Sequence, residues 1–393
     1  MKLYSGEALK LGKDKSENGV KMSFDEITRK YHQGQIRIVT EQARYPLNTI
    51  VGLIESGNYI LKPGFQRRHR WDNKRKSKLI ESFIINVPIP PIFLYETTYS
   101  KYEVMDGLQR ITAIYEFYND GFALEGLEEW SELNGYKYNE LPEVIKLGID
   151  RRYLSSIILL QETAKNELEA LNMKQLVFER LNSGGVDLSD QETRNALYDG
   201  ALNKLCLELS CNTKFRKLFA IPVNVDKKNK ITGNVLYDKM EDVELVLRFF
   251  AFRQIEKWTD NYIKKFLDEY LILGNEFSED TLENLEKCFK VTIDIIYEIM
   301  GESAFRLWKA SRDGNEVKQV TKPTKVLYDA FMLAFCQYLE QTEKIFEKKD
   351  KIRDEIIKIF IEKSELFTSR FNKNDIIKRR DAIKNVIDKV IGE

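Results

Sequence analysis

The run Asp106-Gly107-Leu108-Gln109-Arg110 combines residue types that suit phosphate chemistry. A helix is predicted to begin at Leu108, and Gly107 would let the backbone approach a ligand where the first helical N–H groups have no intrahelical partner. A phosphate or a Mg²⁺-bound phosphate could dock there. Asp106 would hold a metal-bound water or act as base, Gln109 would orient a water, and Arg110 would offset charge on the transferred phosphoryl group. The alternative is that Asp106 only caps the helix, because aspartate is a favoured N-cap residue.

A basic segment lies upstream of this turn. Residues 66–78 carry seven lysine and arginine side chains against one acid, in a chain whose 62 basic and 62 acidic residues cancel. Such a cluster repels itself and is commonly maintained by a bound anion. Gln66, Arg67 and Arg70 come just before a predicted helix, where the arginine fork could hold two phosphate oxygens. We therefore expect these three residues to bind the nucleotide.

The second half of the basic segment is expected to be helical. Its candidate DNA contacts are Lys74, Arg75 and Lys78. The alternative for these side chains is an ordinary solvated helix face.

A third motif spans residues 178–192. One helix is predicted to end at its Asn-Ser-Gly-Gly turn, and Ser189 with Glu192 forms a capping box for the next helix. Around this turn, Arg180, Asn182 and Arg194 could face the nucleotide or DNA; solvation of two helix ends is the alternative. The motif therefore predicts a helix-turn-helix more firmly than it predicts a ligand.

The elements that would position these motifs fall into two regions. Short apolar strands and amphipathic helices alternate in the first region, whereas strand signals almost vanish beyond residue 130 and long helical patterns dominate. The predicted strands are 59–61, 91–95 and 102–105, and the predicted helices are 73–85, 108–118, 241–252, 281–300 and 325–338. The sequence thus predicts an α+β, mainly helical protein: a flexible lead-in at 1–34, an α/β nucleotide-binding domain at 35–200, and an all-α domain at 201–393. The aromatic run 249–252 is expected in the core.

Composition excludes several other classes. Histidine occurs only at His32 and His69, too few for a histidine-rich zinc or nuclease centre. The four cysteines lack C-x-x-C spacing, and the beginning of the chain lacks an apolar signal region, which favours a cytoplasmic protein with reduced thiols. The sequence also contains no G-x-x-x-x-G-K-[ST] loop, no G-x-G-x-x-G turn after a strand and no G-x-S-x-G elbow, and no apolar run is long enough for a membrane span.

Together the three motifs resemble the ParB/sulfiredoxin-like N-terminal domain of the GmrSD-type, modification-dependent restriction proteins. That family shows a Q-R-x-x-x-W segment, matched at residues 66–71, and a D-G-Q-Q-R turn, matched at residues 106–110 with leucine at the third position. It also shows a P-I-P-P segment, matched at 88–91, and an F-x-R-L-N-x-G-G-x-x-L-x-x-Q-E stretch, matched at 178–192. The resemblance covers roughly residues 40–200.

The resemblance implies binding and hydrolysis of a nucleoside triphosphate with Mg²⁺ at the aspartate turn, coupled to sensing or cutting of foreign DNA. Full-length members carry a histidine-metal nuclease domain, which a chain with only two histidines would lack. DNA and a partner nuclease or other defence protein are therefore the expected partners, and a homo-oligomer is compatible with the sequence. The alternative is a non-catalytic DNA-binding or adaptor protein that uses residues 66–78, and a nuclease acting through carboxylates alone is a third hypothesis.

Overall fold

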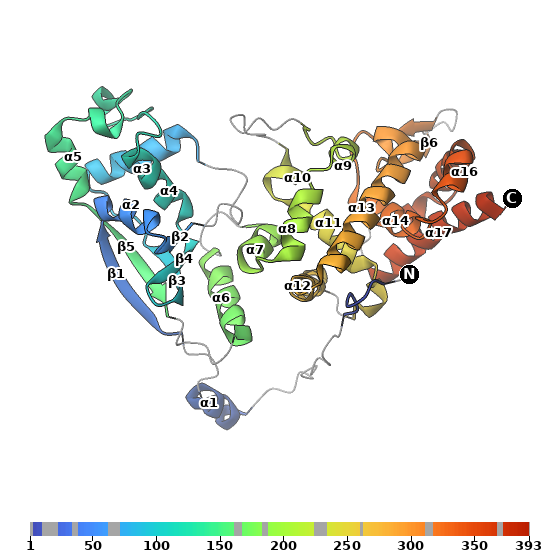
Figure 1. The fold of residues 1–393 in the computed structure, drawn as a ribbon, viewed down its shortest axis with the longest axis horizontal. Helices are drawn as coiled ribbons and strands as arrows, with labels where there is room; N and C mark the ends of the chain where they lie inside the picture. Colours follow the sequence, from blue (N-terminus) through green and yellow to red (C-terminus); the bar gives the residue numbers. More distant parts are fainter. Residues whose placement is uncertain are drawn as a thin grey trace. The chain divides into compact units, whose positions relative to one another are not determined.

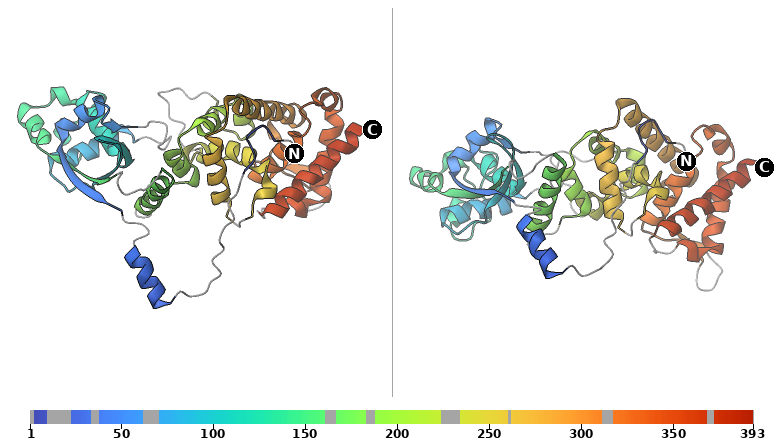
Figure 2. Two further views of the ribbon diagram at one scale, coloured as in Figure 1. Left: turned by 60° about the horizontal axis from the view of Figure 1, so that its bottom comes forward. Right: turned by 90° about the horizontal axis from the view of Figure 1, so that it is seen from below.

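The computed structural model describes residues 3–9, 23–33, 38–61, 71–160, 167–182, 188–223, 234–259, 262–310, 317–367 and 372–392. The chain forms two compact units (Figures 1 and 2). The sheet unit comprises Lys15–Leu188 and Asn195–Leu197, and the helical unit comprises Met1–Asp14, Ser189–Arg194 and Tyr198–Glu393. The sequence placed the boundary near residue 200.

The sheet unit contains one mixed five-stranded sheet in the order β1-β5-β3-β4-β2. Its strands are β1 (Thr40–Pro46), β2 (Tyr59–Ile60), β3 (Ile92–Thr98), β4 (Lys101–Asp106) and β5 (Tyr153–Leu159). Its helices are α1 (Phe24–Gln33), α2 (Leu47–Glu55), α3 (Asn73–Ile84), α4 (Leu108–Tyr118), α5 (Glu143–Asp150) and α6 (Glu167–Asn182), with short 3₁₀ turns η1 (Ser131–Leu133) and η2 (Tyr138–Glu140). Strand β3 pairs with β4 antiparallel and with β5 parallel.

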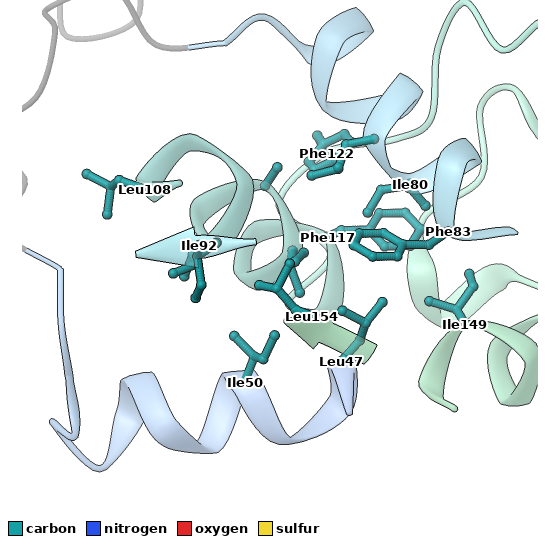
Figure 3. Close-up of a cluster of buried hydrophobic side chains, with 14 of the residues drawn as sticks. Leu47, Ile50, Ile80, Phe83, Ile92, Leu108, Phe117, Phe122, Ile149 and Leu154 are labelled. Atoms are coloured by element: carbon teal, nitrogen blue, oxygen red, sulfur yellow. The ribbon is translucent and has the colours of Figure 1, made fainter. Parts of the chain in front are cut away.

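One face of the sheet carries the core of this unit. Alternate residues of a strand point to the same face, so Ile92 and Leu94 of β3 meet Leu154 and Ile158 of β5 there. Helices α2 to α5 supply the opposing side chains, and Figure 3 shows several of them gathered around Phe117 of α4. This packing fixes the end of β4 and the beginning of α4, where the aspartate turn lies.

Helix α6 packs on the opposite face of the sheet. Glu103 of β4 is nearly buried there, and Lys174 of α6 donates to its Oε2 at 2.7 Å. The same ammonium group lies 5.6 Å from the ring centre of Tyr95 on β3. A buried carboxylate is costly unless it is paired, so this contact ties α6 to the strand that ends at Asp106.

The sheet is strongly coiled. In a flat five-stranded sheet the edge strands β1 and β2 would lie about 19 Å apart, because neighbouring strands are about 4.8 Å apart. The ring centres of Tyr45 on β1 and Tyr59 on β2 are nevertheless only 6.1 Å apart, and Tyr59 packs edge-on against Tyr102 as well. The two edges therefore curl toward each other around the core.

The helical unit is built on a dense aromatic core. Its helices are α7 (Asp190–Leu197, of which residues 195–197 group with the sheet unit), α8 (Ala201–Leu209), α9 (Thr213–Leu218), α10 (Val235–Asp238), α11 (Glu241–Phe252), α12 (Ile263–Gly274), α13 (Glu279–Met300), α14 (Lys325–Phe335), α15 (Thr342–Glu347), α16 (Lys349–Glu362) and α17 (Lys373–Gly392), with 3₁₀ turns η4 (Ile255–Lys257), η5 (Gly301–Ser303) and η6 (Ser364–Phe367). The run 249–252 is at most 1% exposed, which confirms its predicted place in the core. Phe249 and Phe289 pack with ring centres 6.0 Å apart, joining α11 to α13.

The mainly helical α+β class predicted from the sequence is confirmed, but several strands were missed. The most important is β5, a central strand that lies beyond residue 130. A two-stranded ladder of β6 (Trp308–Ala310) and β7 (Val317–Gln319) also interrupts the region expected to be all helical. Among the described residues, no helix is both long enough and apolar enough to span a bilayer.

Ordered structure begins nearer to the start of the chain than the sequence indicated. Residues 3–9 pack into the helical unit, where Glu7 is fully buried, and α1 occupies part of the stretch expected to be a flexible lead-in. The physical reason is the ion pair between Glu7 and Arg253, which a local pattern does not reveal. The polar stretch 12–22 lies outside the described residues.

Candidate functional site

The Asp-Gly turn joins β4 to α4, as predicted. Asp106 is the last residue of β4, where it pairs with Phe93 of β3, and Gly107 is the N-cap residue of α4. Gly107 has a φ of 92°, in the left-handed region that glycine tolerates and other residues disfavour. The turn therefore needs glycine at this position, and it presents the first amides of α4 beside the aspartate.

Asp106 does not cap the helix. The described structure shows no side-chain cap on α4; instead the Oδ2 atom of Asp106 accepts a charged hydrogen bond from Nη2 of Arg110 at 2.6 Å. Its side chain is 46% exposed, and the other carboxylate oxygen, Oδ1, has no hydrogen-bond partner among the described residues. One oxygen of the aspartate is thus held in place while the other remains accessible.

Arg110 also holds the segment that leads into β3. Its Nη1 donates to the carbonyl oxygens of Pro90 and Pro91, the latter at 3.3 Å. Burial lowers the pKa of the guanidinium, and the charge of Asp106 opposes that shift. The family-like P-I-P-P segment and the aspartate turn are therefore joined through one side chain, a contact that the sequence analysis did not foresee.

Gln109 makes the third connection of the turn. Its Oε1 accepts the main-chain N–H of Trp71 at 3.1 Å, across 38 residues of sequence. Trp71, the residue that directly follows the arginine-rich stretch in sequence, is therefore fixed at the aspartate turn. In the structure Gln109 binds protein backbone through its side-chain oxygen.

The nucleotide-binding candidates Gln66, Arg67 and Arg70 lie outside the described residues. The described chain resumes at Trp71, and Asp72 then caps α3 by accepting the N–H of Arg75 at 2.8 Å. Helix α3 begins at the position predicted from the sequence.

The basic face of α3 is exposed but partly neutralised. Lys74, Arg75 and Lys78 are all exposed, as expected for either DNA contacts or a solvated face. Lys78, however, donates to Oε1 of Glu128 at 2.7 Å, and this contact lowers the pKa of the glutamate. The local excess of positive charge counted along the sequence is therefore smaller in space.

A buried glutamate of α3, Glu81, holds the loop that carries Glu128 against the helix. Glu81 of α3 is 7% exposed, and its Oε1 accepts three consecutive main-chain N–H groups, from residues 128, 129 and 130, at 2.8 to 3.0 Å. One turn earlier, Ser77 accepts the N–H of Glu125 at 2.9 Å. The loop of residues 125–130 is thus hydrogen-bonded along α3. Local sequence patterns did not predict this arrangement.

The third motif divides into a helix cap and a buried arginine. The predicted capping box of Ser189 and Glu192 is present at the beginning of α7. Arg194 is neither a solvated helix end nor a group open to a ligand: its side chain is 2% exposed and pairs with Asp268 of α12 at 2.6 Å and Glu244 of α11 at 2.9 Å. Its role is therefore to anchor α7 within the helical unit, and both interpretations of this residue were wrong.

The other two residues of this motif give less information. Arg180 is exposed near the end of α6, whereas the side chain of Asn182 lies outside the described residues. Among the described residues no group of three or more histidine, cysteine, aspartate or glutamate side chains could hold a metal ion.

One of three comparisons with known proteins found a match. No curated protein and no solved structure matches the chain. Residues 47–198 match the sequence model of the family described as "GmrSD restriction endonuclease, N-terminal domain", a stretch that includes the aspartate turn and α3. Residues 47–198 of this protein are therefore similar to the N-terminal domain of the GmrSD restriction endonucleases.

Proposed function

We propose that the sheet unit binds a nucleoside triphosphate with Mg²⁺ at the Asp106 turn and hydrolyses it in the service of a DNA restriction or defence system. The observation that carries this proposal is the accessible Oδ1 of Asp106 beside the amides that begin α4. The first amides of a helix have no intrahelical partner and favour anions, so phosphate oxygens suit this position. The match of residues 47–198 to a restriction endonuclease family model supports a role in a DNA restriction or defence system.

The fit to magnesium rests on the chemistry of the donor. Mg²⁺ prefers hard oxygen ligands, keeps several of its waters and is often held by carboxylates together with phosphates and water. Oδ1 of Asp106 would hold the ion through one of its bound waters, and Arg110 keeps the carboxylate oriented through its other oxygen. The ion, when bound, would neutralise charge on the phosphates.

The arginine-rich stretch is joined along the chain to a residue that the turn binds. Arg70 is the residue before Trp71, whose N–H is bound by Gln109 of the turn. An extended chain spans at most about 3.6 Å per residue, so Arg67 can lie no more than about 14 Å from Trp71 along the backbone. We propose that an arginine side chain of this stretch binds the phosphates at the turn, with Gln66 as a further polar contact.

The reaction requires few protein groups. A water oxygen would attack the terminal phosphorus, and the bond from that phosphorus to the bridging oxygen would break. The nucleoside diphosphate would leave with the electron pair of the broken bond on its oxygen. Asp106 would accept the proton of the attacking water at Oδ1, the oxygen that is accessible in the described structure. An arginine from the 66–70 stretch would offset the charge that develops on the phosphoryl oxygens.

The test is nucleotide binding and phosphate release by the purified chain with Mg²⁺. We expect Asp106→Asn to lower phosphate release by about 100-fold or more, since general-base catalysis typically contributes that much. The double variant Asp106→Ala, Arg110→Ala should also be inactive. Asp25→Asn, an exposed acid on α1, is the matched control and should release phosphate at the native rate. Equal release by the native chain and both Asp106 variants would refute the proposal.

The exposed cations of α3 support a second candidate, a nucleotide-independent DNA-binding or adaptor protein. Phosphate-driven binding weakens steeply as salt rises, so affinity for duplex DNA should be measured across a salt titration, with and without nucleotide. Salt-sensitive DNA binding that no nucleotide changes, in a chain without phosphate release, would favour this candidate. Because Glu128 neutralises Lys78, we place it second.

A further inference from the structure

The helical unit encloses a buried acid from the beginning of the chain. Glu7 is 0% exposed, and its Oε1 pairs with Nη1 of Arg253 at 2.9 Å and accepts the hydroxyl of Tyr270 at 3.3 Å. Its Oε2 accepts the main-chain N–H of Tyr4 at 2.9 Å. A buried carboxylate is costly unless it is paired and hydrogen-bonded, so Arg253 and Tyr270 form a site that selects an acid.

The peptide backbone around Glu7 is bound by side chains. Gln254 donates from Nε2 to the carbonyl of Glu7 at 2.7 Å and accepts the N–H of Leu9 at its Oε1 at 2.9 Å. Lys257 donates to the carbonyl of Leu9 at 2.5 Å, and a threonine hydroxyl at the beginning of α13 donates to the carbonyl of residue 5 at 2.7 Å. The side-chain amide of Gln254 thus binds one carbonyl and one N–H of the segment, as the backbone of a neighbouring strand would.

A tight turn gives the segment its shape. The N–H of Glu7 donates to the carbonyl of Tyr4 at 3.2 Å, and Gly6 between them has a φ of +75°. A positive φ at the third position of such a turn favours glycine, although a Cβ there would meet nothing within 4 Å. The guanidinium of Arg253 lies 4.6 Å from the ring centre of Tyr4, and burial raises the pKa of that tyrosine to about 12. The features recognised are therefore Tyr-x-Gly-Glu-x-Leu.

We infer that α11, η4, α12 and α13 form a receptor site for a short acidic turn peptide, and that residues 3–9 are a separable ligand of this site. Within the described chain, no main-chain hydrogen bond joins the segment to the rest of the unit; every such contact uses a side chain on one partner. Ser5, Gly6 and Ala8 are exposed, so recognition depends on the turn, the acid and two apolar or aromatic positions. This inference concerns the helical unit alone and does not depend on nucleotide chemistry.

The experiment uses the full-length chain with Glu7→Gln, whose own segment is weakened. A fluorescent peptide of residues 1–12 with the native sequence should bind it saturably, as measured by anisotropy. Peptides with Glu7→Gln or Gly6→Ala should bind about tenfold more weakly or worse, because a hydrogen-bonded charge or the turn is lost. A Ser5→Ala peptide is the matched control and should bind like the native one, since only the carbonyl of this residue is used.

Hydrogen exchange distinguishes a ligand from an integral element. In the Glu7→Gln chain, amides of residues 3–9 should exchange faster while α11, α12 and α13 keep their protection. Loss of protection in these helices together with the segment would show that the segment is part of the fold. A folded Glu7→Gln chain that fails to bind the native peptide would overturn the inference equally.

Discussion

Gly107 and Ile92 are packed so closely that a Cβ atom on Gly107 would lie 2.4 Å from Cγ2 of Ile92. The glycine is thus needed for two separate reasons, its left-handed backbone and the lack of space at its Cα. Ile92 begins β3, so the aspartate turn is pressed directly against the neighbouring strand. The position of Asp106 therefore depends on packing as well as on turn chemistry.

Gly107→Ala should destabilise the sheet unit by about 2–5 kcal/mol, because the left-handed backbone costs about 1–2 kcal/mol and overpacking adds about 1–3 kcal/mol. Gly135→Ala is the matched control: its φ is +93°, but an added Cβ would meet nothing within 4 Å. That variant should be destabilised only by the cost of the left-handed backbone, about 1–2 kcal/mol. Urea unfolding of both variants measures the difference, and equal losses would show that the contact with Ile92 relaxes freely.

Gln109→Ala should separate two roles of this residue within the proposed nucleotide site. If its main task is to hold Trp71, the loss of one hydrogen bond of about 1 kcal/mol should raise KM for the nucleotide about fivefold and leave kcat unchanged. A water-orienting role would instead lower kcat. Gln42→Ala, at an exposed position on β1, is the control and should change neither constant.

Arg194→Met should destabilise the helical unit by about 3–5 kcal/mol, because it removes the arginine that pairs with the buried carboxylate of Asp268 and leaves Glu244 with Arg248 alone as an ion-pair partner among the described residues. Lys204→Met, at an exposed position on α8, is the control and should change stability by less than about 0.5 kcal/mol. Thermal or denaturant unfolding tests both. A stable Arg194→Met chain with weakened nucleic-acid binding would restore the ligand role that burial argues against.

Glu128→Gln should reveal whether α3 contacts DNA. The change removes the acid that pairs with Lys78 and should raise affinity for duplex DNA a few-fold at low salt if this face binds phosphates. Lys78→Ala should reduce the slope of log affinity against log salt by about one. Glu132→Gln, an exposed acid in the same region, is the control. No response of DNA binding to either the Glu128 or the Lys78 change would exclude α3 from the interface.

Local chemistry was enough to predict the pieces of the candidate site. The span of α4, the beginning of α3 and the Ser189–Glu192 capping box depend on residues within one or two helical turns, and all three agree with the structure. The Asp-Gly turn was likewise predicted because few residues other than glycine accept its backbone. These features are encoded by neighbours along the chain.

Partners distant in sequence were decided only by the tertiary structure. The uncharged run of β5 could have been a buried helix or a strand, and its place between β1 and β3 makes it a central strand. Arg194 looks solvated in sequence but meets Asp268 74 residues later, and Asp106, for which a helix cap was the alternative interpretation, pairs with Arg110 instead. The sequence determined which groups were available for chemistry. Folding decided their neighbours, because the energy of a buried charge depends on the groups that surround it in space rather than on those beside it in the chain.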